Sequence, residues 1–184
     1  MVVIIPLYFS IMASINQMYE VIHAIRMGFE SEIRDCMYEN TGIIEGLIRE
    51  QIYAGQNGNG KLLNPTYEND PFFEEKGRWY HRNKQYKHWK EKITPPITSE
   101  VLFLPPRPVE VPNLFITGRF HDSITALKSS DGISITTKGF TAGKDIVSKY
   151  GDSIFMLGKE GKSYFSHNIL RPWLERFIKK CGYR

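Results

Sequence analysis

Eight of the ten prolines in this 184-residue chain fall between residues 64 and 112, and they limit what that stretch can fold into. Proline fixes φ and lacks an amide hydrogen, so it interrupts helices and is excluded from central strands. The sequence therefore predicts an irregular arm at about 64–113, in which regular elements fit only between the prolines. These are Pro65, Pro71, Pro95, Pro96, Pro105, Pro106, Pro108 and Pro112.

The end of this arm, residues 101–112, is an apolar strip of partly alternating character. Its prolines bar it from the centre of a sheet. We interpret it either as an edge strand or as a polyproline-like segment that lies on an adjacent protomer, because both would tolerate the missing amide donors.

Two helices are predicted before the arm. Apolar residues recur at steps of three and four from Ser14 to about Glu39, and again from Thr41 to Gly55. This spacing places an apolar stripe along each helix, which indicates either a core-facing pair or a seam packed on a neighbouring subunit. Residues 1–13 are mostly apolar but too few to span a membrane. We interpret them as an N-terminal extension, or alternatively as a short arm used in assembly, and expect no membrane partner.

The last third of the chain predicts a compact set of elements. Alternating residues predict two strands around an Asp-Gly turn, and glycine signals divide the following helices. A chain of 184 residues with 41% hydrophobic residues has the size of one ordinary domain with one hydrophobic core. The expected fold is therefore a single α+β domain over 14–184. The expected elements are a short helix capped by Thr117, strands at 123–128 and 133–138, a helix at 144–157 broken at Gly151, a loop at 158–162 and a closing helix at 166–180.

A basic run interleaved with aromatic residues extends from Arg78 to Lys92. It holds six Lys or Arg residues and one Glu, a local charge of +5 that exceeds the whole-chain net charge of +4. It indicates either a DNA-binding segment, with cations on phosphates and rings on bases, or a helix whose aromatic residues pack inward. The residues expected to face DNA are Arg78, Arg82, Lys84, Lys87, Lys90 and Lys92.

Catalytic patterns are weak throughout the sequence. None of the histidines forms an HExxH pattern, and the glycine-rich loop at 56–61 lacks the GxxxxGK[ST] pattern of a phosphate loop. His121 beside Asp122 is the best acid–base pair, but a surface pair at a helix start is the commoner arrangement. Glu74 and Glu75 could bind a metal, although adjacent acids are usually solvated. We therefore expect no enzyme, no cofactor and no metal.

The order of parts in the last third resembles the tail-completion and head-to-tail joining proteins of tailed bacteriophages, including versions from crAss-like phages. Their pattern is a Thr-Gly start, a twisted hairpin, a Tyr-Gly element and a closing Arg-Pro-aromatic-Leu segment. The matching residues are Thr117, Gly118, Phe120, Ser123, Ile124, Tyr150, Gly151, Arg171, Pro172, Trp173 and Leu174.

This resemblance implies a structural virion protein, made in the host cytoplasm and placed in the neck or tail. It would be one protomer of a closed ring, with portal and adjacent neck or tail proteins as partners and DNA passing through the channel. Twelvefold and sixfold rings both remain open. The residues expected at the subunit interface are Val101, Phe103, Leu104, Phe120 and Trp173. The alternative function is DNA binding through residues 78–92.

Overall fold

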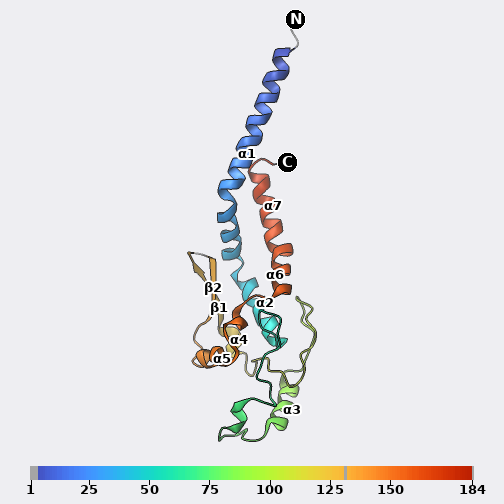
Figure 1. Ribbon diagram of the computed structural model, residues 1–184, viewed down its shortest axis with the longest axis vertical. Coiled ribbons are helices and arrows are strands. Elements are labelled where there is room, and N and C mark those ends of the chain that lie inside the picture. Colours follow the sequence, from blue (N-terminus) through green and yellow to red (C-terminus); the bar gives the residue numbers. More distant parts are fainter. Residues whose placement is uncertain (1–3, 131, 184) are drawn as a thin grey trace. The chain divides into compact units, whose positions relative to one another are not determined.

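The computed structural model describes residues 4–130 and 132–183 and has the predicted α+β fold (Figure 1). It contains a long N-terminal helix, a two-stranded antiparallel sheet and a C-terminal helix. The chain divides into two compact units. The helical unit is helix α1 with the segment from Ser166 onward, and the mixed unit is residues 40–165.

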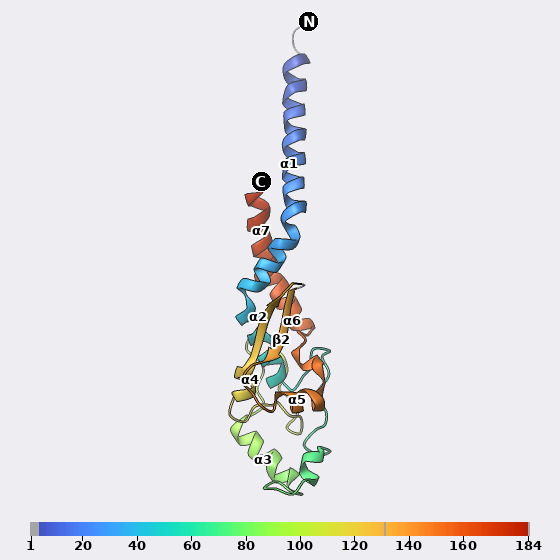
Figure 2. The same cartoon turned by 90° about the vertical axis from the view of Figure 1, so that its left-hand side faces the viewer.

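The helical unit pairs α1, Ile4–Glu39, with α7, Arg171–Lys180 (Figures 1 and 2). Contacts run from Trp173 with Glu32 to Phe177 with Gly28, so residue numbers rise along α7 as they fall along α1. The pair is therefore antiparallel. A Cβ atom at Gly28 would lie 2.8 Å from the Phe177 ring, so this glycine permits the close approach of the helices.

The start of α1 differs from the prediction. The helix begins at Ile4, well before the cap expected at Ser14. Pro6 does not prevent this, because it falls in the first turn, where amide hydrogens have no intrahelical acceptor. The residues from Ile4 to Met12, which were interpreted as part of an N-terminal extension, therefore belong to the same helix as the residues after Ser14.

The structure of residues 158–162 also differs from the prediction. A loop was predicted there, but helix α6, Lys159–Phe165, starts within this segment. Its glycines indicated a turn, but a Cβ at Gly161 would lie 2.5 Å from Leu157 Cδ1. Gly161 thus serves close packing inside a helical turn. A short π-helical segment, η3 (Ser166–Leu170), then precedes α7. Pro172 lacks the amide hydrogen that a regular α-helix would use there, which accounts for the wider turn.

The hairpin of the mixed unit is present as predicted. Strand β1, Ile124–Ser129, pairs antiparallel with β2, Gly132–Thr137, with Ile124 opposite Thr137. Asp131 of the predicted turn lies outside the described residues. The alternation of apolar and polar residues therefore identified both strands correctly.

Helix α4, Arg119–Ser123, leads into β1. Its cap position is Gly118, not Thr117 as predicted, and Gly118 has φ of 81°. Glycine adopts this left-handed conformation without strain, which explains a Thr-Gly pair at this position. After β2, helix α5, Gly143–Tyr150, ends at Gly151 as predicted and is followed by η2, Asp152–Phe155.

Helix α2, Thr41–Tyr53, supplies much of the core of the mixed unit. It is also joined to strand β1 by polar bonds. Glu45 Oε1 accepts the Ala126 amide at 2.8 Å, and Arg49 Nη2 donates to the Ile124 carbonyl oxygen at 2.8 Å. Both bonds satisfy backbone groups that do not pair with β2. The buried apolar residues of α2 are Ile44, Leu47, Ile48 and Ile52.

The proline-rich middle is irregular, as predicted. The regular elements described between residues 64 and 113 are η1, Pro71–Glu74, and α3, Asn83–Ile93. Both lie between prolines or begin at one. Among the described residues, no helix is long and apolar enough to cross a bilayer.

Candidate assembly surfaces

A turn in the proline-rich arm holds one phenylalanine ring in solvent. We name residues 99–104 the Phe103 turn. Ser99 N–H donates to the Leu104 carbonyl oxygen at 3.0 Å, and Leu104 N–H donates to Ser99 Oγ at 2.7 Å. Leu102 and Leu104 are buried, whereas Phe103 between them is 78% exposed and has φ of 52°. This left-handed conformation is strained for a bulky residue, so the surrounding bonds hold the ring outward.

The Phe103 turn is fastened to helix α2 by one carboxylate. Glu50 Oε1 accepts the Val101 amide at 2.7 Å, and Glu50 Oε2 accepts the Leu102 amide at 3.3 Å. Hydrogen bonds to an ionised acceptor are stronger than neutral ones. The turn is therefore a preformed surface.

Arg107 fixes the arm just after the turn. The side chain is buried, and burial lowers the pKa of its guanidinium. Nη1 donates to the Val111 carbonyl oxygen at 2.8 Å, and Nη2 donates to the Thr94 carbonyl oxygen at 2.9 Å. These bonds join the two ends of the segment that carries the Phe103 turn, so Arg107 organises the loop from inside.

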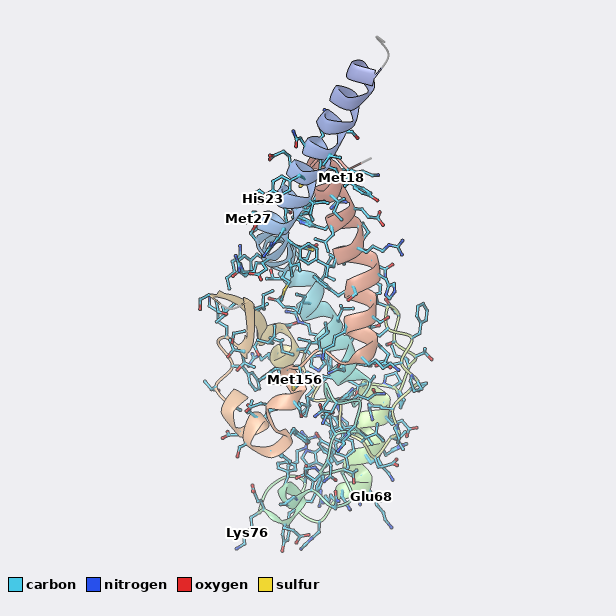
Figure 3. The ribbon with its side chains drawn as sticks, turned by 45° about the horizontal axis from the view of Figure 1, so that its top comes forward. Met18, His23, Met27, Glu68, Lys76 and Met156 are labelled. Carbon is cyan, nitrogen blue, oxygen red and sulfur yellow. The ribbon has the colours of Figure 1, made fainter. Side chains whose placement is uncertain are left out.

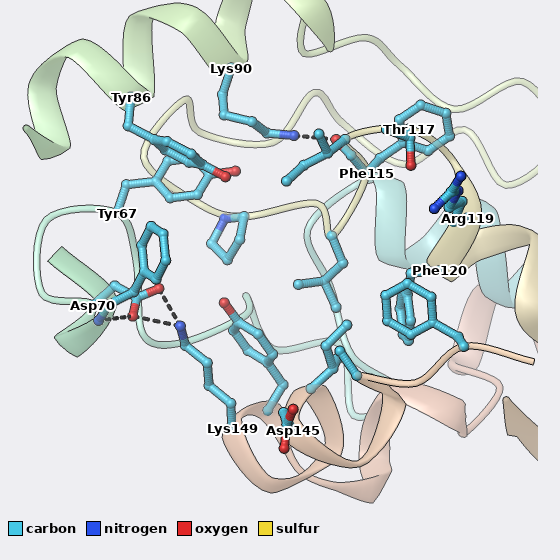
Figure 4. Close-up of a pocket in the computed structure, with 18 of the residues that line it drawn as sticks. Tyr67, Asp70, Tyr86, Lys90, Phe115, Thr117, Arg119, Phe120, Asp145 and Lys149 are labelled. Carbon is cyan, nitrogen blue, oxygen red and sulfur yellow. Dashed lines mark hydrogen bonds and ion pairs between the residues drawn. The ribbon is translucent and has the colours of Figure 1, made fainter. Parts of the chain in front are cut away.

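A pocket of about 550 Å³ opens in the mixed unit (Figure 4). The hydroxyl-bearing rings of Tyr67 and Tyr86 face it from one side. Burial raises the pKa of Tyr86 to about 12, so its hydroxyl stays protonated. A volume of this size can take a small ligand or several side chains. Most of the other lining residues are apolar, among them Phe72, Phe73, Leu114, Phe115, Ile116, Phe120, Phe140 and Ile146.

Charged groups also line the pocket. Lys149 forms an ion pair with Asp70, whose side chain is almost fully buried (Figure 4). Arg119 and Asp145 line the pocket as exposed side chains. The pocket thus combines a mostly apolar lining with a few charged groups, the usual composition of a site that orients a mainly apolar group.

Lys90 reaches the pocket wall from helix α3. Its side chain is only 1% exposed, and Nζ donates to Asn113 Oδ1 at 2.9 Å and to the Phe115 carbonyl oxygen. Burial, and then the charge of Arg107, lower the pKa of Lys90 to about 7. The prediction that Lys90 faces DNA is therefore wrong, because its amine binds oxygen atoms of the protein itself.

The remaining residues of the predicted DNA-facing set stay closer to solvent. Arg78, Arg82, Lys84 and Lys92 are exposed. Lys87 is half-buried and forms an ion pair with Glu68 at 3.2 Å between Nζ and Oε1.

Trp79, Tyr86 and Trp89 of the basic run pack against one another, whereas Tyr80 is exposed. The ring centroids of Trp79 and Tyr86 lie 5.1 Å apart, and those of Trp79 and Trp89 lie 5.4 Å apart. Tyr86 also meets Phe73 edge to face at 5.3 Å. The sequence left open either DNA binding or inward packing of the aromatic residues, and these three rings pack inward.

Helix α1 carries a row of exposed apolar side chains that we name the α1 stripe: Ile15, Met18 and Ile22. Each is more than half exposed, and Met18 is labelled on α1 in Figure 3. Their spacing of three and four residues places them on one face of the helix. Gly28, by contrast, lies against Phe177 of α7, and Val21 lies near Gly182 just after that helix. The core-facing interpretation is therefore wrong for these three residues.

The five predicted interface residues have different environments. Val101 and Phe103 are exposed. Leu104 and Phe120 are buried within the mixed unit, where the ring centroid of Phe120 lies 5.6 Å from that of Phe140, so the prediction is wrong for these two. Trp173 is half-buried, and its Nε1–H donates to Glu32 Oε2 at 2.8 Å.

His121 is not a surface residue, in contrast to the interpretation of the His121-Asp122 pair. It is buried, and its Nε2 lies 2.9 Å from the Asn113 carbonyl oxygen. Burial lowers its pKa to about 4, so the ring is neutral at physiological pH. Glu74 is exposed and lies near His81, with 3.6 Å between Oε2 and Nδ1. Over residues 4–130 and 132–183, no cluster of three His, Cys, Asp or Glu side chains could hold a metal ion.

Local signals could not have revealed the pocket, Glu50 or Arg107, because each depends on contacts between distant segments. Comparison with known proteins finds no matching family model, no matching curated protein and no matching solved structure.

Proposed function

We propose that the protein is a structural component of a tailed-bacteriophage particle, one protomer of a closed ring that connects the portal to the tail. The observation that carries this proposal is the presence of two different apolar surfaces, the α1 stripe and the Phe103 turn. Clustered exposed apolar residues usually mark contact sites. A protomer of such a ring contacts both its sister copies and the adjoining proteins, so it needs more than one contact surface.

The residues that carry the resemblance to tail-completion and joining proteins support the proposal, because they have structural roles here. Gly118 provides the left-handed start of α4, and Phe120 and Ile124 are buried in the core. Gly151 ends α5. The motif thus builds a scaffold that presents surfaces to partners.

Contact with DNA is the second candidate function, and four exposed cations of the basic run favour it: Arg78, Arg82, Lys84 and Lys92. Cations of this kind bind phosphates without sequence preference and lose affinity steeply as salt rises. In a ring, cations that face the channel would offset the negative charge of the DNA that passes through it. In a DNA-binding protein, they would be the main source of affinity.

Two measurements on the purified protein separate these functions. Sedimentation velocity and negative-stain electron microscopy, with and without purified portal, should show rings or a portal-bound complex. Replacing the four exposed cations with Gln should leave this assembly intact and remove salt-dependent DNA binding. A protein that stays monomeric, ignores the portal and binds DNA tightly would support the alternative. Antibody labelling of virions should place the protein at the neck, and its absence from particles would contradict the proposal.

A further inference from the structure

The mixed unit carries both an exposed apolar tip, the Phe103 turn, and an apolar pocket that could receive such a tip. We propose that Phe103 of one copy inserts into the pocket of the next copy, and that this contact repeats around the ring. The contact presupposes the self-assembly proposed above and names the two surfaces that make it.

The tip cannot fill the pocket of its own chain. The pocket lining contains residues up to Lys90 and residues from Pro112 onward, but none from 91–111. The Phe103 turn is also held in place by Glu50, and the arm behind it by Arg107. If a Phe103 side chain fills this pocket, it must therefore belong to another copy of the protein.

The tip and the pocket agree in size and character. At 78% exposure, Phe103 offers roughly 150 Å² of aromatic surface for burial. Val101 and Pro105 are exposed on either side of it, whereas Leu102 and Leu104 between them are buried. The pocket of about 550 Å³ has room for the ring and its neighbours. Because a stable interface buries about 800 Å² on each partner, Phe103 is the anchor of a larger contact.

The charges of the two surfaces differ. The arm over 94–112 contains two acidic residues, Glu100 and Glu110, and one basic residue, Arg107, which is buried and bound to its own carbonyl oxygens. The pocket lining is balanced, with Arg119 and Lys149 against Asp70 and Asp145, because Lys90 is buried and bound to oxygen atoms of its own chain as Arg107 is. An acidic tip would repel a second tip but not the balanced pocket, which disfavours tip-to-tip contacts.

This contact joins two different patches and is therefore head-to-tail. Each copy that has docked its tip still has an empty pocket for the next copy. Such a series either closes into a ring or continues as a filament, depending on the rotation between neighbours.

The test uses one variant for each side and a matched control on the full chain. Phe103→Asp removes the tip, and Ile116→Asp places a charge in the pocket lining. Leu127→Asp, on strand β1 and outside the pocket lining, is the control. All three positions are exposed, so circular dichroism should show folded proteins. Sedimentation velocity should show self-association at least roughly 30-fold weaker for Phe103→Asp and Ile116→Asp, and unchanged for Leu127→Asp.

Mixing the two variants gives the decisive result. Phe103→Asp keeps an intact pocket and Ile116→Asp keeps an intact tip, so the mixture should form a 1:1 complex and nothing larger. If the wild-type protein associates and either variant does so equally well, the contact is wrong but the ring proposal survives. Failure of the mixture to pair would also overturn it.

Two further outcomes would contradict the contact between copies. If Ile116→Asp self-associates normally but no longer binds the portal, the pocket receives a side chain of a different protein, and the contact between copies is wrong. A wild-type protein that is monomeric at every concentration also overturns this contact, and portal binding then decides the proposed function separately.

Discussion

The buried cations of the mixed unit and the exposed apolar residues of helix α1 form a contrast between the two units. The mixed unit buries even cations, and Lys90 and Arg107 use their N–H groups on carbonyl and amide oxygens of its own chain. In the helical unit, α1 leaves large apolar side chains such as Met18 in solvent. The difference indicates that internal contacts hold these cations of the mixed unit, whereas the α1 stripe would be buried only if a partner covered it.

Arg107→Met should give the largest effect on folding. The change leaves several buried carbonyl oxygens without a donor, and we expect the free energy of unfolding to fall by about 3 kcal/mol or more. Urea denaturation measures this. The matched control is Arg82→Met, an exposed position at which the change should stay within about 0.5 kcal/mol. Equal effects at the two positions would show that the buried cation does not organise the mixed unit.

Glu50→Ala should have an intermediate effect. It removes the acceptor of the Val101 and Leu102 amides, so the free energy of unfolding should fall by about 1 to 2 kcal/mol. Hydrogen exchange at these two amides should also become faster. Glu50→Gln keeps one acceptor oxygen and should be milder. Unchanged exchange in Glu50→Ala would mean that the turn is held by other contacts.

Lys90 should make stability depend on pH above neutrality. Its pKa is lowered to about 7 in the folded protein, so between pH 7 and about 10 the unfolded chain binds more protons than the folded one. The free energy of unfolding should therefore rise with pH in this range, by up to about 1 kcal/mol per pH unit, and this gain is lost as pH falls towards 7. Urea denaturation of wild type and Lys90→Met at pH 7.5, 8.5 and 9.5 measures the difference in slope. Parallel slopes would contradict it.

Ile22→Glu should have the smallest effect on folding. The side chain is already exposed, so the free energy of unfolding should change by less than about 0.5 kcal/mol. Self-association or portal binding should weaken, because a charge then lies in the α1 stripe. A large loss of stability would indicate that this face is part of the folded core, and the contrast between the units would disappear.

Local signals account for what could be predicted from the sequence. The strands of the hairpin follow from alternating side chains, and the end of α5 follows from Gly151, because each signal lies within a few residues of its effect. The burial of Lys90 could not be predicted in this way. It depends on Asn113 and Phe115, more than twenty positions away, which the irregular arm brings alongside. The segment 158–162 was misread because Gly161 serves packing rather than a turn.

The strained backbone at Phe103 has a kinetic consequence. Because folding alone sets the ring in place, docking would require little ordering and would lose little conformational entropy. Addition of each copy would then resemble the collision of rigid bodies, with a rate set by encounter frequency and orientation rather than by a slow rearrangement. Newly made copies could thus join a growing ring as soon as they have folded.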